Sequence, residues 1–353
     1  MTIELETGAA GDDRFRKAFA QVQRSVRQAP YDRALPPPEH WEKHVQLGGA
    51  DASFWIARRA GTPVGRIGAT ISPTRAGAGY VGYFEAADGG DPTIAVPLMD
   101  TAFAWLRIRG VEKAYGPIDR STWYGYRYRV ESRPGDVCAA HEEPFAWEPW
   151  QPAGYVDAFA TAGFVEVERY YSHGYRGVDG MHVKDAAELV SGAADMAKSQ
   201  GYVLEPFSTN WEEVLPDLYA VGNVCFARNF LFEPIGFEEF RALYDGVGTK
   251  VDYRPSAWLV DAAGVKRGFI FAYVDRGYVV MKTVGVAPEL RRGGLSLALL
   301  WFACDRCVAL GHDGTIGALL KQGNNSEGLL RNGFAGATAW RHDYALYERP
   351  LTP

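Results

Sequence analysis

The stretch that most constrains the fold of this chain is residues 285–310, which read GVAPELRRGGLSLALLWFACDRCVAL. It joins an apolar strand, Gly277–Val286, to a long apolar helix through a turn with two adjacent glycines. At the start of a helix several backbone N–H groups lack intrahelical partners and the macrodipole is positive, so the turn suits an anion. The charged and small residues of this turn are Arg291, Arg292, Gly293, Gly294 and Ser296.

The spacing within the turn is more specific than its composition. It reads Val286-x-Pro288-x-x-Arg291-x-x-Gly294-Leu295-Ser296, directly after a strand and at the start of a helix. This spacing resembles the acetyl-CoA pyrophosphate loop of the GNAT N-acetyltransferase superfamily, V-x-P-x-x-(Q/R)-x-x-G-x-(G/A). Only the last position departs from the pattern, and serine is small enough to leave the helix start close to the phosphates. The resemblance implies that acetyl-CoA binds here as a co-substrate.

The same resemblance implies how the rest of the acyl donor is held. In the family, the signature strand, here Gly277–Val286, splays from the next strand, here Thr315–Leu320. Val284 and Val286 would then offer backbone groups to the pantetheine arm, and an N–H near Val284 or Gly285 would polarise the acetyl carbonyl. Asn325, in the turn after the second strand, is a further candidate contact to this arm.

Two catalytic groups found in many members of the family are missing. The position of the tyrosine that protonates the leaving thiolate is occupied by Leu329, and the signature strand carries Lys282 and Thr283 but no carboxylate. Glu233, on the loop before the second helix of this half, and Tyr344, on the last strand, are the remaining candidates. For both residues the sequence favours an ordinary surface or packing role over a catalytic one.

Composition limits the class of protein. The 353 residues exceed the usual size of one domain, and 47% apolar with 23% charged residues is typical of a globular protein. A net charge of −6 argues against a nucleic-acid partner, and no apolar run has membrane-spanning length. The acidic N-terminus lacks the pattern of a signal peptide, so we expect a cytoplasmic protein. Cys304 and Cys307 lie inside the apolar helix, which favours core packing over a metal or redox site.

The order of predicted elements repeats along the chain, which indicates an internal duplication. We expect an α/β (α+β) protein of two GNAT-like domains, residues 1–177 and 178–353, each with a mixed, mainly antiparallel sheet flanked by helices. Helices are predicted at Arg14–Gln28, Thr93–Arg109, Tyr155–Thr161, Trp211–Asn223, Phe237–Tyr244 and near Ser326–Arg331, and a helix over Asp185–Ser199 would lead into the second half. Besides the two strands named above, strands are predicted at Ser53–Arg59, Val64–Ile71, Gly79–Glu85, Lys113–Pro117, Val165–Gly174, Tyr202–Phe207, Ala257–Asp261, Arg267–Asp275 and Asp343–Glu348. In the first half the corresponding turn, Phe84–Asp91, is acidic and has no arginine, so it would repel a pyrophosphate. The first half is therefore predicted to be a degenerate copy that shapes the substrate site, and the chain resembles a bacterial subgroup of tandem GNAT proteins.

An aromatic and acidic stretch, His141–Tyr155, is the candidate acceptor site. Acids beside aromatic faces suit a cationic amine through ion pairing and cation–π contact. The alternative is an ordered loop that packs its aromatic residues on the sheet. The candidate substrate-binding residues, which include one acid of the Phe84–Asp91 turn, are Glu85, Glu143, Trp147, Glu148 and Trp150.

The sequence therefore predicts an N-acetyltransferase that moves acetyl from acetyl-CoA to a primary amine of a small molecule or peptide by direct attack. It would use no metal, bind no nucleic acid or membrane, and act as a monomer or homodimer. Two alternatives stay open. One is a non-catalytic acyl-CoA-binding regulator, and the other is an aminoacyl transferase of the tandem GNAT-like type, against which the intact pyrophosphate loop and the acidic charge balance argue.

Overall fold

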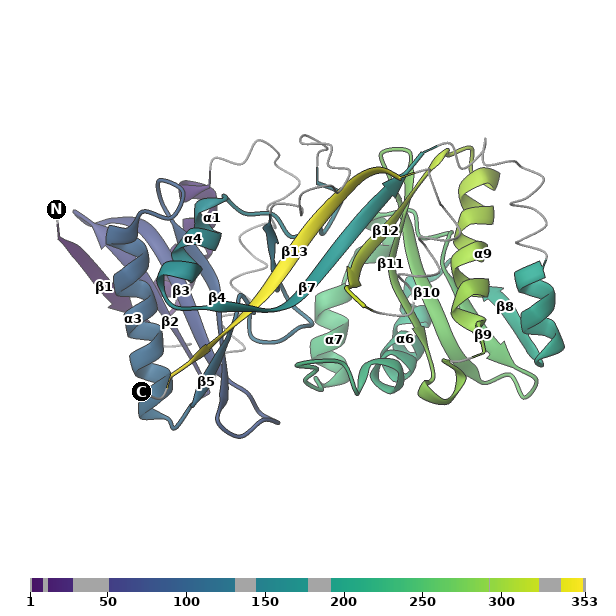
Figure 1. Cartoon of the computed structure of the whole chain (residues 1–353), viewed down its shortest axis with the longest axis horizontal. Coiled ribbons are helices and arrows are strands. Elements are labelled where there is room, and N and C mark those ends of the chain that lie inside the picture. Colours follow the sequence, from purple (N-terminus) through teal and green to yellow (C-terminus); the bar gives the residue numbers. More distant parts are fainter. Residues whose placement is uncertain are drawn as a thin grey trace. The chain divides into compact units, whose positions relative to one another are not determined.

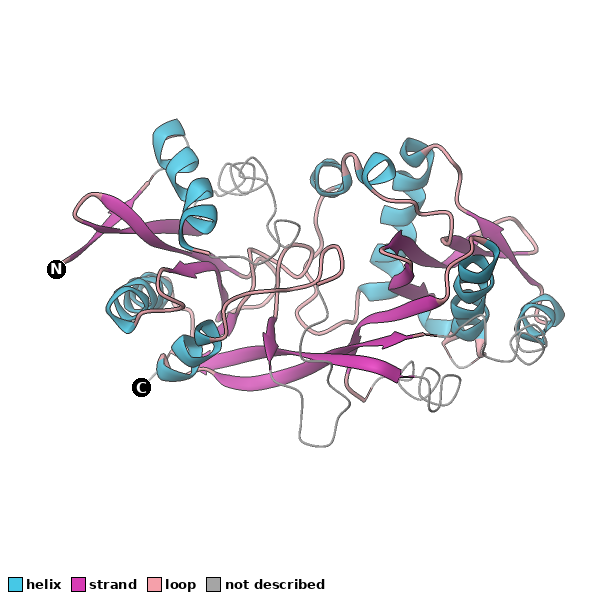
Figure 2. Ribbon diagram, turned by 90° about the horizontal axis from the view of Figure 1, so that it is seen from above, coloured by secondary structure: helices cyan, strands magenta, loops and turns pink. Residues whose placement is uncertain are grey.

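The computed structural model describes residues 2–8, 12–27, 51–130, 144–176, 192–291, 293–323 and 338–351, which fall into two units (Figure 1). Among the described residues, unit 1 comprises 2–8, 12–27, 51–130, 144–169 and 343–351. Unit 2 comprises 170–176, 192–291, 293–323 and 338–342. In each unit, helices cover both faces of the sheet strands (Figure 2).

Unit 1 is built on a sheet with strand order β1-β2-β3-β4-β5-β13. Its strands pair antiparallel except β4 and β5, which are parallel, and the short β6 pairs with β13. The labelled elements of this unit and the two long strands that it shares with unit 2 are β1 (Ile3–Thr7), α1 (Asp13–Val26), β2 (Ala52–Arg59), β3 (Thr62–Ile71), β4 (Ala78–Ala86), α3 (Pro92–Ile108), β5 (Lys113–Gly116), β6 (Tyr128–Val130), α4 (Gly154–Thr161), β7 (Val165–Tyr175) and β13 (Thr338–Pro350).

Side chains alternate between the two faces along the strands of unit 1, and apolar side chains on both faces explain why helices cover both. Trp55 and Ala57 of β2 point to one face and pack with α3, whereas Phe54 and Ile56 point to the other and pack with α1. Tyr83 of β4 joins the second group. A sheet that is apolar on both faces needs a helix on each, and the strongly apolar β2–β4 sequences supply that pattern.

Unit 2 repeats this architecture with strand order β7-β12-β11-β10-β9-β8. Again one pair, β11 with β12, is parallel and the others are antiparallel. Its further elements are β8 (Tyr202–Pro206), α6 (Trp211–Phe226), α7 (Phe237–Tyr244), α8 (Val247–Lys250), β9 (Ala257–Asp261), β10 (Lys266–Asp275), β11 (Tyr278–Val286), the 3-10 turn η2 (Pro288–Leu290), α9 (Leu295–Ala309) and β12 (Gly314–Lys321).

The core of unit 2 follows the same alternation. Ile270 and Ala272 of β10 pack with α9, whereas Phe269 and Phe271 point to the opposite face and contact aromatic side chains of α6. Both cysteines of the C-x-x-C pattern are buried in α9, which confirms that they pack in the core. Burial also raises the pKa of the Cys304 thiol well above its ordinary value.

The two units do not coincide with the two halves of the sequence. Residues Tyr170–Tyr175 of β7 pair with β12 and therefore complete the sheet of unit 2. Residues 343–350 of β13 pair with β5 and β6 and complete the sheet of unit 1. Each unit thus borrows its last strand from the other half of the chain. The expected boundary near residue 177 divides the sequence repeats and lies at the edge of residues 177–191, which are outside the described residues.

The predicted elements agree closely with the structure. All predicted helices and strands within the described residues form, with ends shifted by about one to five residues. The pattern did not predict β1, β6 or α8, which are five, three and four residues long. A helix expected near Ser326–Arg331 lies outside the described residues. The elements β1, β6 and α8 carry too few residues to show a hydrophobic period.

Candidate functional site

The edge of β11 is the first part of the site. The parallel register of β11 with β12 ends where Met281 lies opposite Gly317, yet β11 continues to Val286. The Ala287 N–H donates to the Arg267 carbonyl at 2.8 Å, and antiparallel pairs alternate in their bonding direction. The backbone groups of Gly285 therefore point to β10, and those of Val284 and Val286 point to the opposite edge.

This geometry matches the splayed signature strand that was expected. Two backbone N–H groups, those of Val284 and Gly285, were candidates to polarise the acetyl carbonyl. The N–H of Gly285 is directed to β10, so the N–H of Val284 is the remaining candidate. A backbone edge without a neighbouring strand can accept an extended polar ligand as an additional strand. The pantetheine arm of coenzyme A, with its amide groups, has that character.

The turn after β11 forms the second part. Pro288–Leu290 makes one 3-10 turn, and Gly293 N–H donates to the Leu290 carbonyl at 3.0 Å. Gly294 then takes a left-handed backbone conformation with φ of +73°, which glycine adopts without strain. The Arg291 guanidinium donates to the Cys225 carbonyl at the C-terminal end of α6, at 2.6 Å. A cation is favoured there by the negative end of the α6 dipole.

Helix α9 begins without a side-chain cap. Its N-cap residue is Gly294, and no described side chain accepts from its first N–H groups. Leu295 is buried and Ser296 is half-buried, so the helix start is held firmly by its core side. Uncapped N–H groups at the positive end of a 15-residue helix form an anion site of the kind that binds phosphate. The residues present therefore fit a pyrophosphate.

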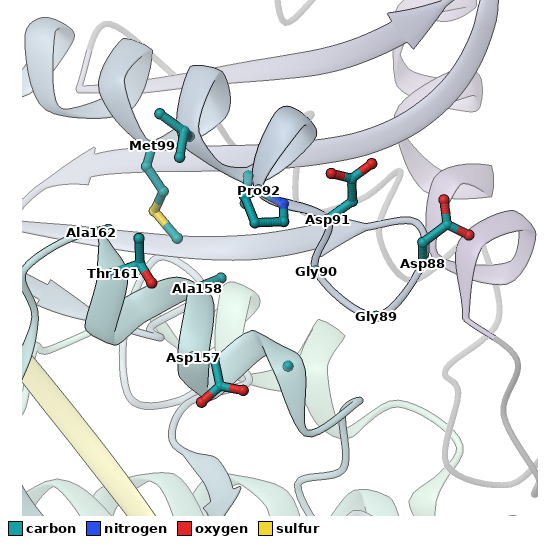
Figure 3. A pocket seen from close by; sticks show the side chains of 13 residues that line it. Asp88, Gly89, Gly90, Asp91, Pro92, Met99, Asp157, Ala158, Thr161 and Ala162 are labelled. Atoms are coloured by element: carbon teal, nitrogen blue, oxygen red, sulfur yellow. The ribbon is translucent and has the colours of Figure 1, made fainter.

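The corresponding turn in unit 1 is built differently. Helix α3 is capped by Asp91, whose carboxylate accepts from the Thr93 N–H at 2.8 Å and also binds Arg59 at 2.8 Å. The hydrogen bond from the Thr93 backbone is the main cause that lowers the pKa of Asp91. A pocket of about 290 Å³ lies at this turn, between α3 and α4, and its rim carries Asp88, Asp91 and Asp157 (Figure 3). An acidic, already capped helix start is unsuited to a pyrophosphate.

The edge of β4 in unit 1 is also occupied. The β4–β5 register ends where Tyr80 lies opposite Tyr115, and the chain that follows β5 continues beside β4. Ile118 N–H donates to the Val81 carbonyl at 2.9 Å, and the Asp119 carboxylate accepts from the Tyr83 N–H at 2.5 Å. Among the described residues, no strand pairs with the Val284–Val286 edge of β11 in unit 2, whereas protein fills the corresponding position beside β4 in unit 1.

The close fit of this segment is visible at Gly82. A Cβ atom on Gly82 would lie 2.1 Å from the Ile118 carbonyl oxygen, so only glycine fits. Burial raises the pKa of Asp119 to about 7, although its hydrogen bond from Tyr83 lowers it. Asp119 is not apparent from the sequence pattern, whose nearest local signal is Pro117, two residues earlier.

Glu85, a predicted substrate-binding residue, lies inside unit 1. Its carboxylate accepts from Arg27 at 2.8 Å, Gln23 at 2.9 Å and Tyr155 at 2.9 Å, and Arg66 lies 3.7 Å away. Its side chain is 1% exposed. These contacts bury the Glu85 carboxylate among protein groups, and its substrate-binding role stays a prediction.

The aromatic and acidic stretch of the acceptor prediction is partly turned inward. Glu148 is buried, accepts from the Phe145 N–H at 3.1 Å, and accepts from the Tyr344 hydroxyl at 2.5 Å. The Trp150 carbonyl accepts from Arg27, and Trp147 is the exposed aromatic residue of the described part. Packing of this loop on unit 1, the alternative stated from the sequence, accounts for Glu148 and Trp150.

The catalytic candidates are both buried, in different units. Tyr344 lies on the part of β13 that belongs to unit 1, and Glu233 lies in unit 2 before α7 with 1% exposure. Their catalytic roles stay predictions. Three other predicted site residues, Arg292, Asn325 and Glu143, lie outside the described residues.

Two further searches concern metals and membranes. Within the ranges that the structure describes, no group of three or more His, Cys, Asp or Glu side chains converges as a metal site. In the same ranges, no helix has the length and apolar character needed to cross a membrane.

Comparison with known proteins identifies structures with a similar fold. No protein-family model matches the sequence, and no curated protein matches it significantly. Solved structures do match, over nearly the whole chain. A tandem GNAT protein from the clavulanic acid biosynthesis pathway, solved without acetyl-CoA, is 16% identical with a TM-score of 0.56, and the match covers 99% of both chains.

Two other structures show the same likeness. A conserved protein of unknown function from Enterococcus faecalis V583 has a TM-score of 0.59 at 11% identity, covering 99% of this chain and 73% of that one. A GCN5-related N-acetyltransferase from Kribbella flavida has a TM-score of 0.51 at 12% identity, covering 99% and 72%. The chain thus has the tandem GNAT fold that the sequence predicted.

Proposed function

We propose that this chain is an acyltransferase that moves the acetyl group of acetyl-CoA to a primary amine of a small molecule or peptide by direct attack. The observation that carries the proposal is the edge of β11 at Val284–Val286, which no described strand pairs, followed at once by the start of α9, which no described side chain caps. One part fits a pantetheine arm and the other a pyrophosphate, and they occur in the same order as in the ligand. Acetyl-CoA supplies an activated thioester when bound.

The residues of unit 2 that would hold the acyl donor have distinct roles. The N–H groups at Leu295 and Ser296 would bind phosphate oxygens, and Arg291 would add positive charge beside them. Val284 and Val286 would bond the pantetheine arm, with the Val284 N–H stabilising the negative charge that develops on the acetyl oxygen. Arg292 and Asn325 keep their predicted cofactor contacts as part of this proposal.

The reaction itself is simple in its balance. The lone pair of the neutral amine forms a C–N bond with the thioester carbonyl carbon, and the C–S bond then breaks. The thiolate leaves, and the proton lost by the amine neutralises it directly or through solvent. The amine must therefore be deprotonated, which predicts faster turnover as pH rises toward the pKa of the acceptor.

Unit 1 is proposed to hold no acyl donor. The Asp91 cap and the acidic rim stand where a pyrophosphate would bind, and Ile118 and Asp119 occupy the strand edge. The helix cap, the acidic rim and the filled strand edge of unit 1 each oppose binding of an acyl donor there. We expect one acetyl-CoA per chain.

A second candidate function is a non-catalytic acyl-CoA-binding regulator. The burial of both catalytic candidates, Glu233 and Tyr344, favours it. The two functions are separated by incubating the intact chain with acetyl-CoA and a panel of amines, including diamines, amino acids and peptides, and by measuring released thiol. Thiol release that needs an amine, with a matching acetylated product by mass spectrometry, supports the enzyme. Acetyl-CoA binding without release for any amine supports the regulator.

A further inference from the structure

We propose that Gln200 is a positioning residue for the pyrophosphate of the acyl donor, because it fixes the orientation of the peptide group between Gly293 and Gly294. This inference rests on the proposed function of unit 2 and adds a residue that lies outside the pyrophosphate-loop pattern. Gln200 follows the helical residues 192–199, which precede β8. This helix packs against the turn before α9, where Gln200 and Met196 meet the two glycines.

The contact between Gln200 and the turn is direct. The Gln200 side-chain amide donates to the Gly293 carbonyl at 2.9 Å. Its own backbone N–H donates to the carbonyls of Met196 and Ala197, at 3.2 and 3.1 Å, so the residue is anchored at the end of its helix. The donor therefore comes from a fixed element and not from the turn itself.

The orientation of one peptide group matters here because the two residues it joins are both glycines. A glycine pair has no Cβ atoms to restrict rotation, and the peptide plane between them can turn over at little cost. In a trans peptide the C=O and the following N–H point in opposite directions. Holding the Gly293 carbonyl toward Gln200 therefore directs the Gly294 N–H away from that helix, where it can donate to an anion together with the N–H groups of α9.

The side of the turn that faces the helix is already filled. A Cβ atom on Gly293 would lie 2.9 Å from the Gln200 side-chain oxygen, and one on Gly294 would lie 3.2 Å from the Met196 sulfur. The ligand must then approach from the opposite side, which is the side to which the Gly294 N–H points. If the peptide turned over, it would present a carbonyl oxygen to the phosphate and repel it.

An ordinary packing role for Gln200 predicts something different. Gln200 is exposed, and a glutamine at the end of a helix can bond a nearby carbonyl without any effect on a ligand. Such a role would change stability slightly, and it would either leave acyl-donor affinity unchanged or weaken every acyl donor equally. A positioning role would weaken only donors that carry the pyrophosphate.

The test uses the intact chain and the variants Gln200→Met and Gln200→Glu, which keep the length of the side chain but remove its N–H donors. Ser199→Ala is the matched control, because the Ser199 hydroxyl bonds within its own helix, to the Met196 carbonyl. Each protein is titrated with acetyl-CoA and, by competition at millimolar concentration, with S-acetylpantetheine, which lacks the pyrophosphate. Amide hydrogen exchange of the peptide that spans 291–297 is measured without ligand.

We expect Gln200→Met to weaken acetyl-CoA binding about five- to tenfold, the size of one lost hydrogen bond, with no change for S-acetylpantetheine. Amide exchange in the turn should accelerate in this variant and stay unchanged in the Ser199→Ala control. Equal affinity of Gln200→Met and the wild type for acetyl-CoA, or equal weakening of both donors, would overturn this inference alone. The proposed function would instead be overturned if the wild type binds no acetyl-CoA although amide exchange of residues 291–297 is faster in Gln200→Met than in the wild type.

Discussion

The buried charge network around Glu85 allows a sharp test of whether this residue serves structure or substrate. The Arg27, Arg66 and Glu85 side chains are 9%, 0% and 1% exposed, and the carboxylate lies 2.8 Å from one guanidinium and 3.7 Å from the other. Glu85→Gln keeps the shape but leaves two buried guanidinium groups without their shared counter-charge. Removing one partner of a buried ion pair costs about 3–5 kcal/mol.

That loss should be visible in the thermal unfolding of unit 1. For a unit of this size each 1 kcal/mol lowers the melting temperature by about 2–4 °C, so Glu85→Gln should lower it by about 6–20 °C. The assay is differential scanning calorimetry, which resolves separate transitions if the two units unfold separately. Asp88→Asn is the control, because its exposed carboxylate is in the turn that follows Glu85 but contributes about 0.5 kcal/mol or less.

A melting temperature within about 2 °C of the wild type would contradict the buried network, since it would mean a loss below about 1 kcal/mol. An unchanged stability combined with a raised KM for the amine acceptor would restore the substrate-binding role that the sequence suggested. If the network is structural, acetyl-CoA affinity at unit 2 should stay unchanged in Glu85→Gln.

Two more predictions concern the segment that fills the strand edge of unit 1. The folded-state pKa of Asp119 is raised to about 7 from an ordinary value near 4. Between these two pH values the folded state therefore binds more protons than the unfolded state. The free energy of unfolding consequently falls as pH rises through this window. Asp119→Asn should therefore gain melting temperature over the wild type progressively from pH 4.5 to 7.5, and a difference that is constant or shrinks would refute this. Gly82→Ala should destabilise unit 1 by about 1–3 kcal/mol in urea unfolding, because its Cβ atom has no room beside Ile118. Unaltered stability in Gly82→Ala would show that the segment does not occupy the strand edge.

Local patterns predicted most of the elements, because helices and strands of ordinary length show their period in the sequence. Thr93–Arg109, for example, was predicted as a helix and forms as Pro92–Ile108, since its apolar residues recur at three- and four-residue intervals and Asp91 caps it. The strand, turn and helix of residues 277–310 could be predicted equally well, because all of these residues lie within one short stretch.

The exchange of strands between the two halves of the chain, in which β7 completes unit 2 and β13 completes unit 1, could not be predicted in the same way. Residues 170–175 and 343–350 have ordinary strand patterns, and only long-range pairing decides which sheet they join. The buried network around Glu85 could not be predicted from the sequence for a related reason. Its partners Arg27 and Tyr155 are 58 and 70 residues away in the sequence, and no local pattern links them.

The exchange also determines how the central claim should be tested. Separated halves cut at residue 177 would each lose a sheet-completing strand, so the intact chain must be used. Gly294 is the position to change, and Gly294→Ala is the matched control. Both substitutions meet the positive φ and the Met196 contact, at a cost of about 1–2 kcal/mol, but only Gly294→Glu adds a negative charge.

The decisive measurement is calorimetric titration of the intact wild type, Gly294→Ala and Gly294→Glu with acetyl-CoA. We predict one site per chain in the wild type and binding by Gly294→Glu at least about 100-fold weaker than by Gly294→Ala, because like charges about 5 Å apart at an effective dielectric near 20 repel by about 3 kcal/mol. Two equivalent sites would contradict the asymmetry between the units. No binding by the wild type, or equal affinity of the two variants, would contradict the claim that the turn before α9 holds the pyrophosphate.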